Sequence, residues 1–460
     1  MSFEACLKCT ICVAHCPVLR VAPAFRGPKL LGPDLARLRE PYPDLPAALA
    51  VDARELDQCT GCRTCDLVCP AGVSPSELIR EARSGTGPKR FRDLMLGRNE
   101  DLARIVGPLA AVANAAMSVG TVARVAKTAL RLAANRPLPR YARQALRAWG
   151  KRRSQAAGVT AAEAGIPGRV AYFYGCYANY HRPELGQALV EVLERNGFQV
   201  TLPEQRCCGL PMLANGDRRR AIRNAEFNLS RLLREVEAGA IVVTTCTSCA
   251  LALRRDYPRL LGAPAPGGDG AAAEAARRVA AKVYDVSELL LELHAGGQLD
   301  TGFGAVPGLT ANPGLAAAPR LGYHAPCHQK MLGIGTPALE LLSLVPGLEV
   351  HDLDAGCCGM AGTHGFKAEH YAAAMAIGEP LFEAVQGLFL AGGEVPPAAA
   401  AARLTGATVL TDCGTCQMQI EHGTGARTMH PVEVLRLAYR RGDEARERQA
   451  HAGTQGGLGM

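Results

Sequence analysis

Two runs of four cysteines near the start of the chain share one internal spacing. The first reads CLKCTICVAHCP and the second reads CTGCRTCDLVCP. Their cysteines are Cys6, Cys9, Cys12 and Cys16 in the first run and Cys59, Cys62, Cys65 and Cys69 in the second. Three thiolates at this spacing can wrap one face of an iron–sulfur cube, and the fourth, followed by proline, ligates the other cube in two-cluster proteins. The runs therefore predict two cubane 4Fe–4S clusters.

The crossed ligand pattern assigns one cysteine of each run to the other cluster. The first predicted cluster takes Cys6, Cys9, Cys12 and Cys69, and the second takes Cys59, Cys62, Cys65 and Cys16. Zinc is disfavoured here because structural zinc sites use paired Cys-x-x-Cys units rather than a continuous run. The segment between the runs is long for a small two-hairpin ferredoxin, so we expect the helical type of two-cluster domain.

Ten further cysteines form two sets of five in the second half of the chain. Each set contains a single cysteine, an adjacent pair followed by glycine, and a final Cys-x-x-Cys. The first set is Cys176, Cys207, Cys208, Cys246 and Cys249, and the second is Cys327, Cys357, Cys358, Cys413 and Cys416. The interval from the single cysteine to the pair is 31 residues in one copy and 30 in the other, so this half of the chain repeats itself.

Strand-like and helical stretches alternate around these cysteines. Strands are expected at 170–174, 198–202 and 240–245 in the first copy and at 321–324, 348–351 and 407–411 in the second. The resulting βαβαβ order predicts a parallel sheet in each copy. Because each cysteine group follows a strand, five thiols should converge at the carboxyl edge of each sheet, where such folds bind ligands. Gly209 and Gly359 follow the cysteine pairs and are expected to let the backbone approach a bulky ligand.

Five thiols are one more than a cubane needs. Adjacent cysteines can bridge neighbouring irons of a distorted cluster, so one or two further iron–sulfur clusters are expected in this half. Zinc and spare thiols remain alternatives, whereas a disulfide between adjacent cysteines is strained.

The segment between the two halves is basic and rich in alanine. The stretch from Ile105 to Ala123 carries no charge and is nearly long enough to span a bilayer, but its hydropathy is weak. Arg124, Lys127 and Arg131 then lie on one helical face. The segment predicts either helices that lie on an anionic membrane surface or linker helices that pack on neighbouring subunits, and a true span is less favoured.

Composition excludes several classes of protein. With 48% hydrophobic and 20% charged residues, the chain of 460 residues cannot be wholly disordered, and it has no run typical of a multi-span membrane protein. No secretory signal follows Met1, so the clustered cysteines are expected in a reducing compartment, where they bind metals. The net charge of +8 is concentrated in the middle segment, which contains few aromatic residues, and we expect no nucleic-acid partner.

The predicted fold class is α+β and α/β, with a helical ferredoxin domain followed by two βαβαβ repeats. Expected boundaries are 1–80 for the ferredoxin domain, 81–165 for the basic segment, 166–300 and 301–440 for the two repeats, and 441–460 for a flexible tail. The stretches 262–282 and 301–319, rich in glycine, alanine and proline, and the insert at 391–402 are expected to be loops.

These motifs together resemble a known family. Besides the first cysteine run, the resemblance is carried by GPKLLGPDLARLR, YGCYANYHRPELG, CCGLPMLANG, HAPCH, CCGMAGTHGFKAEHY and TDCGTCQMQIE. The chain resembles the iron–sulfur subunits of flavin-linked dehydrogenases, and among them the C subunits of anaerobic glycerol-3-phosphate dehydrogenases. Its repeats, with their Cys-Cys-Gly (CCG) motifs, also resemble the B subunits of heterodisulfide reductases, which implies non-cubane 4Fe–4S clusters at the two sets of five cysteines.

The resemblance implies a peripheral electron-transfer subunit on the cytoplasmic side of the cell membrane. Its partners would be A-type and B-type subunits, including a flavoprotein, that oxidise glycerol 3-phosphate to dihydroxyacetone phosphate, and the quinone pool would receive the electrons. The alternatives are a glycolate or lactate oxidase complex, or a heterodisulfide-reductase-type enzyme. A zinc-structured interaction protein is the least favoured.

The sequence shows no sign of an organic substrate site. It lacks a G-x-G-x-x-G after a strand, a phosphate-binding P-loop, an H-E-x-x-H motif and a Ser-His-Asp arrangement, so we expect an electron carrier and no catalytic residue, and whether the chain is an enzyme by itself stays open. His324 and His328 flank Cys327, and His364 follows the second cysteine pair. These histidines predict either contact with the electron acceptor or local hydrogen bonds that tune a cluster.

Overall fold

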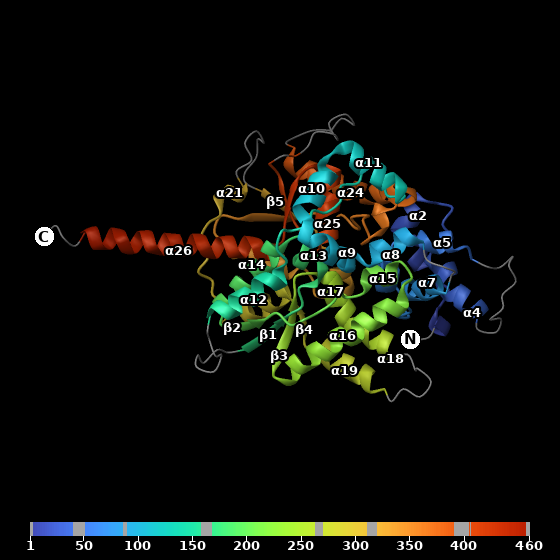
Figure 1. The fold of residues 1–460 in the computed structure, drawn as a ribbon, viewed down its shortest axis with the longest axis horizontal. Coiled ribbons are helices and arrows are strands. Elements are labelled where there is room, and N and C mark those ends of the chain that lie inside the picture. The colour runs from blue at the N-terminus through green and yellow to red at the C-terminus, as the bar shows by residue number, and fades with distance from the viewer. Residues whose placement is uncertain are drawn as a thin grey trace.

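Helices alone build the N-terminal part of the described chain, and two parallel sheets follow (Figure 1). The computed structural model describes residues 3–39, 51–85, 90–157, 168–262, 270–310, 320–390, 404 and 406–456. The N-terminal elements are η1 (Phe3–Ala5), α1 (Ile11–Ala14), α2 (Pro17–Val21), α3 (Gly27–Lys29), η2 (Leu30–Asp34), α4 (Leu35–Arg39), α5 (Ala53–Asp57), α6 (Thr64–Leu67) and α7 (Pro75–Ser84). The described residues before Gly168 contain no strand, which confirms the helical type of ferredoxin domain.

The first repeat contains a four-stranded parallel sheet in the order β2-β1-β3-β4. Its elements are β1 (Gly168–Tyr172), α13 (Gly175–Tyr180), α14 (Pro183–Arg195), β2 (Phe198–Thr201), α15 (Leu210–Ala214), α16 (Arg218–Glu237), β3 (Ala240–Thr244), α17 (Thr247–Leu251), η5 (Ala252–Asp256), α18 (Tyr257–Gly262), α19 (Ala271–Ala280), β4 (Val283–Asp285) and α20 (Val286–Ala295). Val170 of β1 lies opposite Val200 on one side and Ile241 on the other. Such β-branched side chains favour the extended backbone of a buried parallel strand.

The second repeat contains an equivalent sheet in the order β6-β5-β7-β8. After α21 (Pro307–Thr310), its elements are β5 (Arg320–Tyr323), α22 (Cys327–Leu332), α23 (Pro337–Ser343), β6 (Glu349–Asp352), η6 (His364–Phe366), η7 (Ala368–His370), α24 (Tyr371–Phe389), β7 (Thr408–Leu410), α25 (Gly414–Thr424), β8 (Arg427–Met429) and α26 (Pro431–Gly456). The predicted βαβαβ order is confirmed in both repeats. Each sheet also gains a short fourth strand, β4 or β8, that the sequence pattern does not predict.

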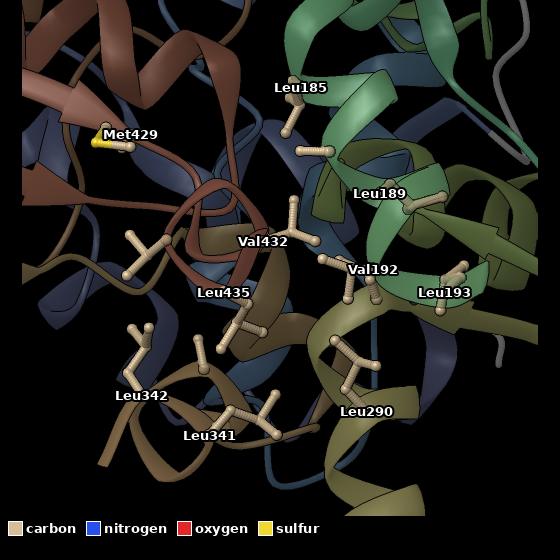
Figure 2. Close-up of a cluster of buried hydrophobic side chains, with 14 of the residues drawn as sticks. Leu185, Leu189, Val192, Leu193, Leu290, Leu341, Leu342, Met429, Val432 and Leu435 are labelled. Carbon is tan, nitrogen blue, oxygen red and sulfur yellow. The ribbon is translucent and has the colours of Figure 1, made fainter. Parts of the chain in front are cut away.

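The two repeats share one hydrophobic core because each sends its last helix to the other. Helix α20 of the first repeat packs on α23 of the second, and α26 of the second packs on α14 of the first. Figure 2 shows Leu189 and Val192 of α14 near Val432 of α26, with Leu290 and Leu341 below them. This exchange fixes the two sheets relative to each other, so the two sets of cysteines that follow their strands are held in one rigid unit.

The basic segment forms helices that cover the cysteine-bearing side of the repeats. They are α8 (Phe91–Gly97), α9 (Asn99–Val106), η4 (Gly107–Leu109), α10 (Ala110–Ser118), α11 (Gly120–Ala129) and α12 (Leu146–Ala157). In the described part of the chain, no single helix has the length and apolar character to cross a bilayer. The consecutive segments Asn99–Ser118 and Gly120–Ala129 together have the length and composition of a span, but they meet at an angle of 101°.

Two segments differ from their expected conformations. Helix α19 lies inside the stretch 262–282, for which the composition predicts a loop, since its Ala273 and Val279 side chains are buried against neighbouring helices. Helix α26 continues through residues 441–456, in place of a flexible tail, and projects from the body of the molecule (Figure 1). Ion pairs between residues one helical turn apart support this extension, and they join Arg441 to Glu444 and Arg446 to Asp443. The insert at 391–402 lies outside the described residues.

Candidate metal centres

The structure gathers the thiols of the first predicted ferredoxin set. Burial raises the pKa of Cys12 to about 11, and the nearby thiols of Cys6, Cys69 and Cys9 raise it further. These four cysteines also line one pocket. The approach of Cys69 to the first run is the arrangement that the crossed assignment requires.

The second ferredoxin set is assembled in the same way. Burial raises the pKa of Cys59 to about 11, with further contributions from Cys62 and from Cys16 of the first run. Cys65 lies close to Cys59 and Cys62, and burial raises its pKa well above the usual value. Cys16 of the first run therefore lies beside the second run, just as Cys69 of the second run lies beside the first.

The backbone of the two ferredoxin loops repeats an uncommon conformation. Thr10 and Arg63 each follow the second cysteine of a run, and each has a φ of 64°. Lys8 and Gly61 precede the same cysteines with φ of 58° and 68°. Left-handed backbone at a residue other than glycine is strained and is usually kept where function requires it. Here it curls the loop so that successive thiols face one point.

The five thiols of the first repeat converge at the carboxyl edge of its sheet. Neighbouring sulfurs are in contact from Cys176 to Cys207, and from Cys208 to Cys249 and Cys246. Hydrogen bonds from Cys207 and Cys249 lower the pKa of Cys208 to about 6. A thiol of this kind is ionised near neutral pH and is therefore prepared to bind a metal.

The second repeat builds the same arrangement. The Sγ atoms of Cys358 and Cys416 are 3.2 Å apart, and Cys357 contacts Cys327. Hydrogen bonds from Cys357 and Cys416 lower the pKa of Cys358 to about 5, and a hydrogen bond from Cys416 lowers that of Cys413 to about 6. In each repeat, the structure thus brings together the five cysteines that the sequence predicts as one set.

The glycines after the cysteine pairs serve a purpose that the sequence does not predict. Gly209 and Gly359 have φ of 90° and 84°, which is left-handed backbone. A Cβ on Gly359 would lie 2.0 Å from the carbonyl oxygen of Ala374 in α24, and one on Gly209 would lie 3.3 Å from Ala221 in α16. These glycines therefore allow the turn and the close packing of the helix that follows.

The donor set fits iron–sulfur clusters. All 18 cysteines are free thiols, and none forms a disulfide. They are divided among four groups of four or five sulfurs, which matches the thiolate ligands of four-iron clusters. The two sets of five exceed the four ligands of a zinc ion, and the two sets of four lie in continuous runs rather than in paired Cys-x-x-Cys units. When bound, such clusters supply one-electron transfer. The thiolates would hold them, and the surrounding protein sets their charge environment.

Three of the four cysteine groups lie close together. Cys62 of the second ferredoxin set is close to Cys327 of the second repeat. Burial is the main cause that raises the pKa of Cys62, and the nearby Cys327 thiol is the next. Cysteines from the five-member sets of both repeats in turn line one cavity of about 770 Å³. Cys59 and Cys62 of the second ferredoxin set line the same cavity. The second ferredoxin set therefore lies beside both repeats, and its Arg63 pairs with Asp256 of the first repeat.

Two of the three histidines that the sequence singles out make local contacts. His328 lies between the Ser248 hydroxyl, 2.8 Å from its Nδ1, and the Gly61 carbonyl oxygen, 3.5 Å from its Nε2. Burial lowers its pKa to about 4. His364 stacks on His370 at 4.1 Å. These contacts agree with the alternative that the histidines form local interactions.

Four side chains of the basic segment also lie near the cysteine groups or line their cavity. They are not part of the cysteine motifs. Asn99 donates from Nδ2 to the Cys176 sulfur at 3.6 Å, and Glu100 accepts the backbone N–H of Cys207 at 2.6 Å. Lys127 and Arg136 are 9% and 1% exposed, whereas a basic run is usually solvated. No signal in the local sequence distinguishes these two cations from their exposed basic neighbours.

Arg136 is a buried cation beside the second repeat. Its Nη1 donates to Gln419 at 2.6 Å and its Nε donates to the carbonyl oxygen of Gly365 at 3.1 Å. Burial lowers its pKa, and the nearby Tyr371 and Cys358 oppose that shift. The guanidinium therefore faces the negative charge that a cluster at this site would carry.

Replacing Arg136 with methionine should lower the reduction potential of the centre at the second repeat. Methionine keeps the buried chain but removes the positive charge that stabilises an added electron. A redox titration followed by electron paramagnetic resonance (EPR) checks this, with Arg143→Met, at an exposed position of the same segment, as the control. Equal potentials in the wild type and both variants would show that Arg136 does not act on the centre.

Comparison with known proteins matches the same divisions of the chain. Residues 2–73 match a family described as a 4Fe-4S dicluster domain, and residues 170–254 and 321–421 match the cysteine-rich CCG domain. The C subunit of anaerobic glycerol-3-phosphate dehydrogenase from Escherichia coli strain K12 is 34% identical over 441 residues, which is 95% of this chain and 98% of that protein. The chain belongs to the family of these C subunits.

Two more distant relatives place the family among oxidoreductase subunits. The B subunit of fumarate reductase (CoM/CoB) from Methanothermobacter marburgensis is 24% identical over 95% of this chain and 72% of its own length. Lactate utilization protein A of Geobacillus kaustophilus is 31% identical over 43% of this chain and 75% of its own length. The family member described here is thus an iron–sulfur electron-transfer subunit of an oxidoreductase, and partner subunits are implied.

Proposed function

We propose that this chain takes electrons from a flavoprotein that oxidises glycerol 3-phosphate and delivers them to a membrane quinone. The observation that carries the proposal is the arrangement of the cysteine groups, which extend from a ferredoxin set with exposed Cys9 to one cavity lined by the second ferredoxin set and both repeats. The donor is inferred from the relative at 34% identity, whose name specifies glycerol-3-phosphate dehydrogenase. We further propose cubane clusters at the ferredoxin sets, ligated by the crossed cysteines, and non-cubane clusters at the sets of five.

The first ferredoxin set is the proposed entry point for electrons. Cys9 is exposed, and Leu7 beside it is 68% exposed. Ile11 and Leu67, which lie inside the two cysteine runs, are also exposed. An apolar surface around an accessible cluster suits a protein partner, because docking there brings the partner's cofactor near the cluster. We assign this surface to the flavoprotein.

The proposed membrane contact is the outer face of the bent helices α9 to α11. Ile105, Leu109, Val112, Val119, Val122 and Val125 are between 47% and 74% exposed. The sequence from residue 102 to residue 162 contains no acidic residue, and it includes exposed Arg104, Arg124 and Arg131. Apolar side chains surrounded by cations favour the surface of an anionic bilayer.

The double substitution Val112→Glu and Val125→Glu should weaken binding to anionic lipid vesicles at least about tenfold, since it replaces apolar contact with two negative charges. Vesicle co-sedimentation at fixed ionic strength measures the effect. Leu38→Glu alters an exposed apolar residue in the ferredoxin domain and serves as the control. Unchanged vesicle binding in the double variant would remove α9 to α11 as the membrane contact.

The cavity between the repeats is the proposed quinone site. One wall carries the cysteines, and the other is formed by apolar side chains of the basic segment, among them Leu102, Val106 and Met117. Because the opposite face of the same helices is the proposed membrane contact, a lipophilic molecule could reach the cavity directly from the bilayer. Quinones need such an apolar site with a few polar groups.

Two polar residues in the cavity wall suit a quinone headgroup. The Nδ1 of His181 donates to the carbonyl oxygen of Arg140 at 2.9 Å, so the neutral ring presents Nε2 as an acceptor. Lys127 donates to the carbonyl oxygen of Ala134 at 3.0 Å and has further N–H groups to offer. The reaction adds two electrons from the flavoprotein and two protons to the quinone, which converts both carbonyl oxygens to hydroxyls.

Binding of a fluorescent quinol analogue tests this function. Ala116 lines the cavity, whereas Ala115, the preceding residue of α10, is exposed. We expect Ala116→Trp to raise the dissociation constant at least about tenfold, because the indole fills the site, and Ala115→Trp to leave it unchanged in detergent solution. Wild-type protein that binds no analogue would refute quinone as the acceptor. Equal binding by both variants would place the quinone elsewhere.

A thiol or disulfide substrate is the second candidate for the cavity. It is favoured by the approach of both five-cysteine sets to one space and by a relative whose name includes CoM/CoB. Release of electrons to a disulfide in place of the quinone analogue would support it. A lactate donor is less favoured, since the lactate utilization relative covers 43% of the chain.

A further inference from the structure

His324 is buried beside the second set of five cysteines. It directly follows β5 and is 1% exposed. One of its ring nitrogens, the Sγ of Cys358 and the Sγ of Cys416 all lie within 4.8 Å of one another. The two sulfurs belong to different segments, one after β6 and one in α25, so three separate parts of the repeat converge here.

The His324 ring has a nitrogen that no described residue satisfies. Its Nε2 is buried and has no hydrogen-bond partner within the described ranges. A buried polar atom without a partner is costly, and an ion bound at the site is one way in which it is satisfied. Donor atoms bound to one first-row metal ion can be up to about 4.4 Å apart, the sum of a sulfur and a nitrogen bond length. The Sγ atoms of Cys358 and Cys416 are 3.2 Å apart, and the ring nitrogen lies within 4.8 Å of both.

We propose that His324 is a sixth ligand at the second repeat and binds an iron atom that Cys358 or Cys416 also contacts. The inference rests on the iron–sulfur assignment of this site but not on the identity of the electron donor or acceptor. It adds a nitrogen ligand to a site whose other donors are thiolates.

The first repeat has no counterpart of this ligand. Counted back from the single cysteine of each repeat, His324 occupies the position of Phe173. Phe173 is fully buried and belongs to the same apolar cluster as Cys207 and Cys208. A phenyl ring offers no lone pair, so the first site is left with thiolates alone. The two repeats therefore hold chemically different centres despite their equal sets of cysteines.

The charges beside the two sites predict an order of reduction potentials. Buried Arg136 lies near Cys358 of the second repeat, and a positive charge stabilises the added electron. In the first repeat, the buried carboxyl of Glu100 contacts the backbone of Cys207 instead. The second repeat should therefore be the more easily reduced of the two.

Pulsed EPR of the whole protein, grown with histidine that carries a heavy nitrogen isotope, tests the ligand directly. A nitrogen bound to iron gives a strong hyperfine coupling, and a hydrogen-bonded nitrogen gives a weak one. We expect one cluster signal with strong coupling in the wild type and its loss in His324→Phe, which reproduces the first repeat. His430→Phe removes another buried histidine, whose Nε2 lies 3.6 Å from Asp412 Oδ1, and it should keep the coupling.

The wild-type spectrum decides the matter even if a variant fails to fold. Absence of strong nitrogen coupling on every cluster signal, in protein with a full iron content, would overturn the proposal. Strong coupling that persists in folded His324→Phe would also overturn it. Loss of the coupling in folded His324→Phe, with the iron content retained, would support the ligand.

Discussion

Replacing Asp256 with alanine is expected to destabilise the fold by about 3–5 kcal/mol, the usual cost of removing one partner from a buried ion pair. Asp256 is fully buried in η5. Its carboxylate accepts hydrogen bonds from Arg63 at 2.6 and 2.8 Å and from Arg80 at 3.1 Å. Burial opposes its ionisation, yet the two arginines hold the pKa of Asp256 well below the usual value.

The loss should also reach the second ferredoxin set. Arg63 lies between Cys62 and Cys65 and is 3% exposed, so alanine at position 256 would leave a buried cation with less compensation inside the cluster loop. Denaturant unfolding of the iron-loaded protein measures the destabilisation, and the visible absorbance of the clusters reports their retention. Because the Asp256 carboxylate stabilises the fold only while ionised, its contribution is present above the unfolded pKa and is lost as the pH falls towards the folded value.

Asp443 provides the matched control for this substitution. It also pairs with two arginines, Arg195 and Arg446, but it is 46% exposed on α26. Exposed pairs contribute about 0–1 kcal/mol, so Asp443→Ala should have a small effect. If the two alanine variants unfolded at the same denaturant concentration, the buried network would not be what joins the ferredoxin domain to the first repeat.

Cys69→Ser and Cys16→Ser are expected to remove different clusters. In each variant, the cluster that is lost should be the one held mainly by the other run of cysteines. Each variant should lose about four irons per chain, one cluster's share. Cys69→Ser should remove the cluster held with Cys6, Cys9 and Cys12, because the Cys69 thiol lies near Cys12. Cys16→Ser should remove the one near Cys59.

Magnetic coupling distinguishes the two clusters. The set that includes Cys62 lies close to Cys327 of the second repeat, so its EPR signal should be broadened by the neighbouring centre. Cys16→Ser should abolish this broadened signal, and Cys69→Ser should leave it. The reverse result would establish an uncrossed assignment, in which each run of four holds its own cluster.

The sequence was sufficient to group the cysteines because the grouping depends on local features. Spacing within a run determines which thiols a short loop can direct to one point. The residues before and after Cys9 have the same left-handed backbone as the residues before and after Cys62. In the repeats, β-branched strands followed by cysteine place thiols at the carboxyl edge of a parallel sheet. Both features involve residues that are close in the chain or related by a simple repeat.

What the sequence did not predict depends on contacts between distant segments. Arg136 is far in the chain from Gln419 and Gly365, which make its burial possible. The short strand β4 has three residues and is stabilised by pairing with β3, so its own pattern is too short to recognise. Gly359 follows the cysteine pair, where the sequence suggests close approach of the backbone to a ligand. In the structure, the position that a Cβ of residue 359 would take is blocked by the carbonyl oxygen of Ala374 in α24. Such cases require the packed structure.

Metal analysis of anaerobically purified protein decides whether the cysteine groups carry electrons. Iron, acid-labile sulfide and zinc are determined, and low-temperature EPR is recorded on the same sample. Four filled sites predict about 16 irons and an equal amount of sulfide per chain, with no stoichiometric zinc, and signals that interact with one another. About 8 irons would leave only the ferredoxin sets as electron carriers. Zinc in place of iron at the two sets of five cysteines would contradict an electron path through the repeats.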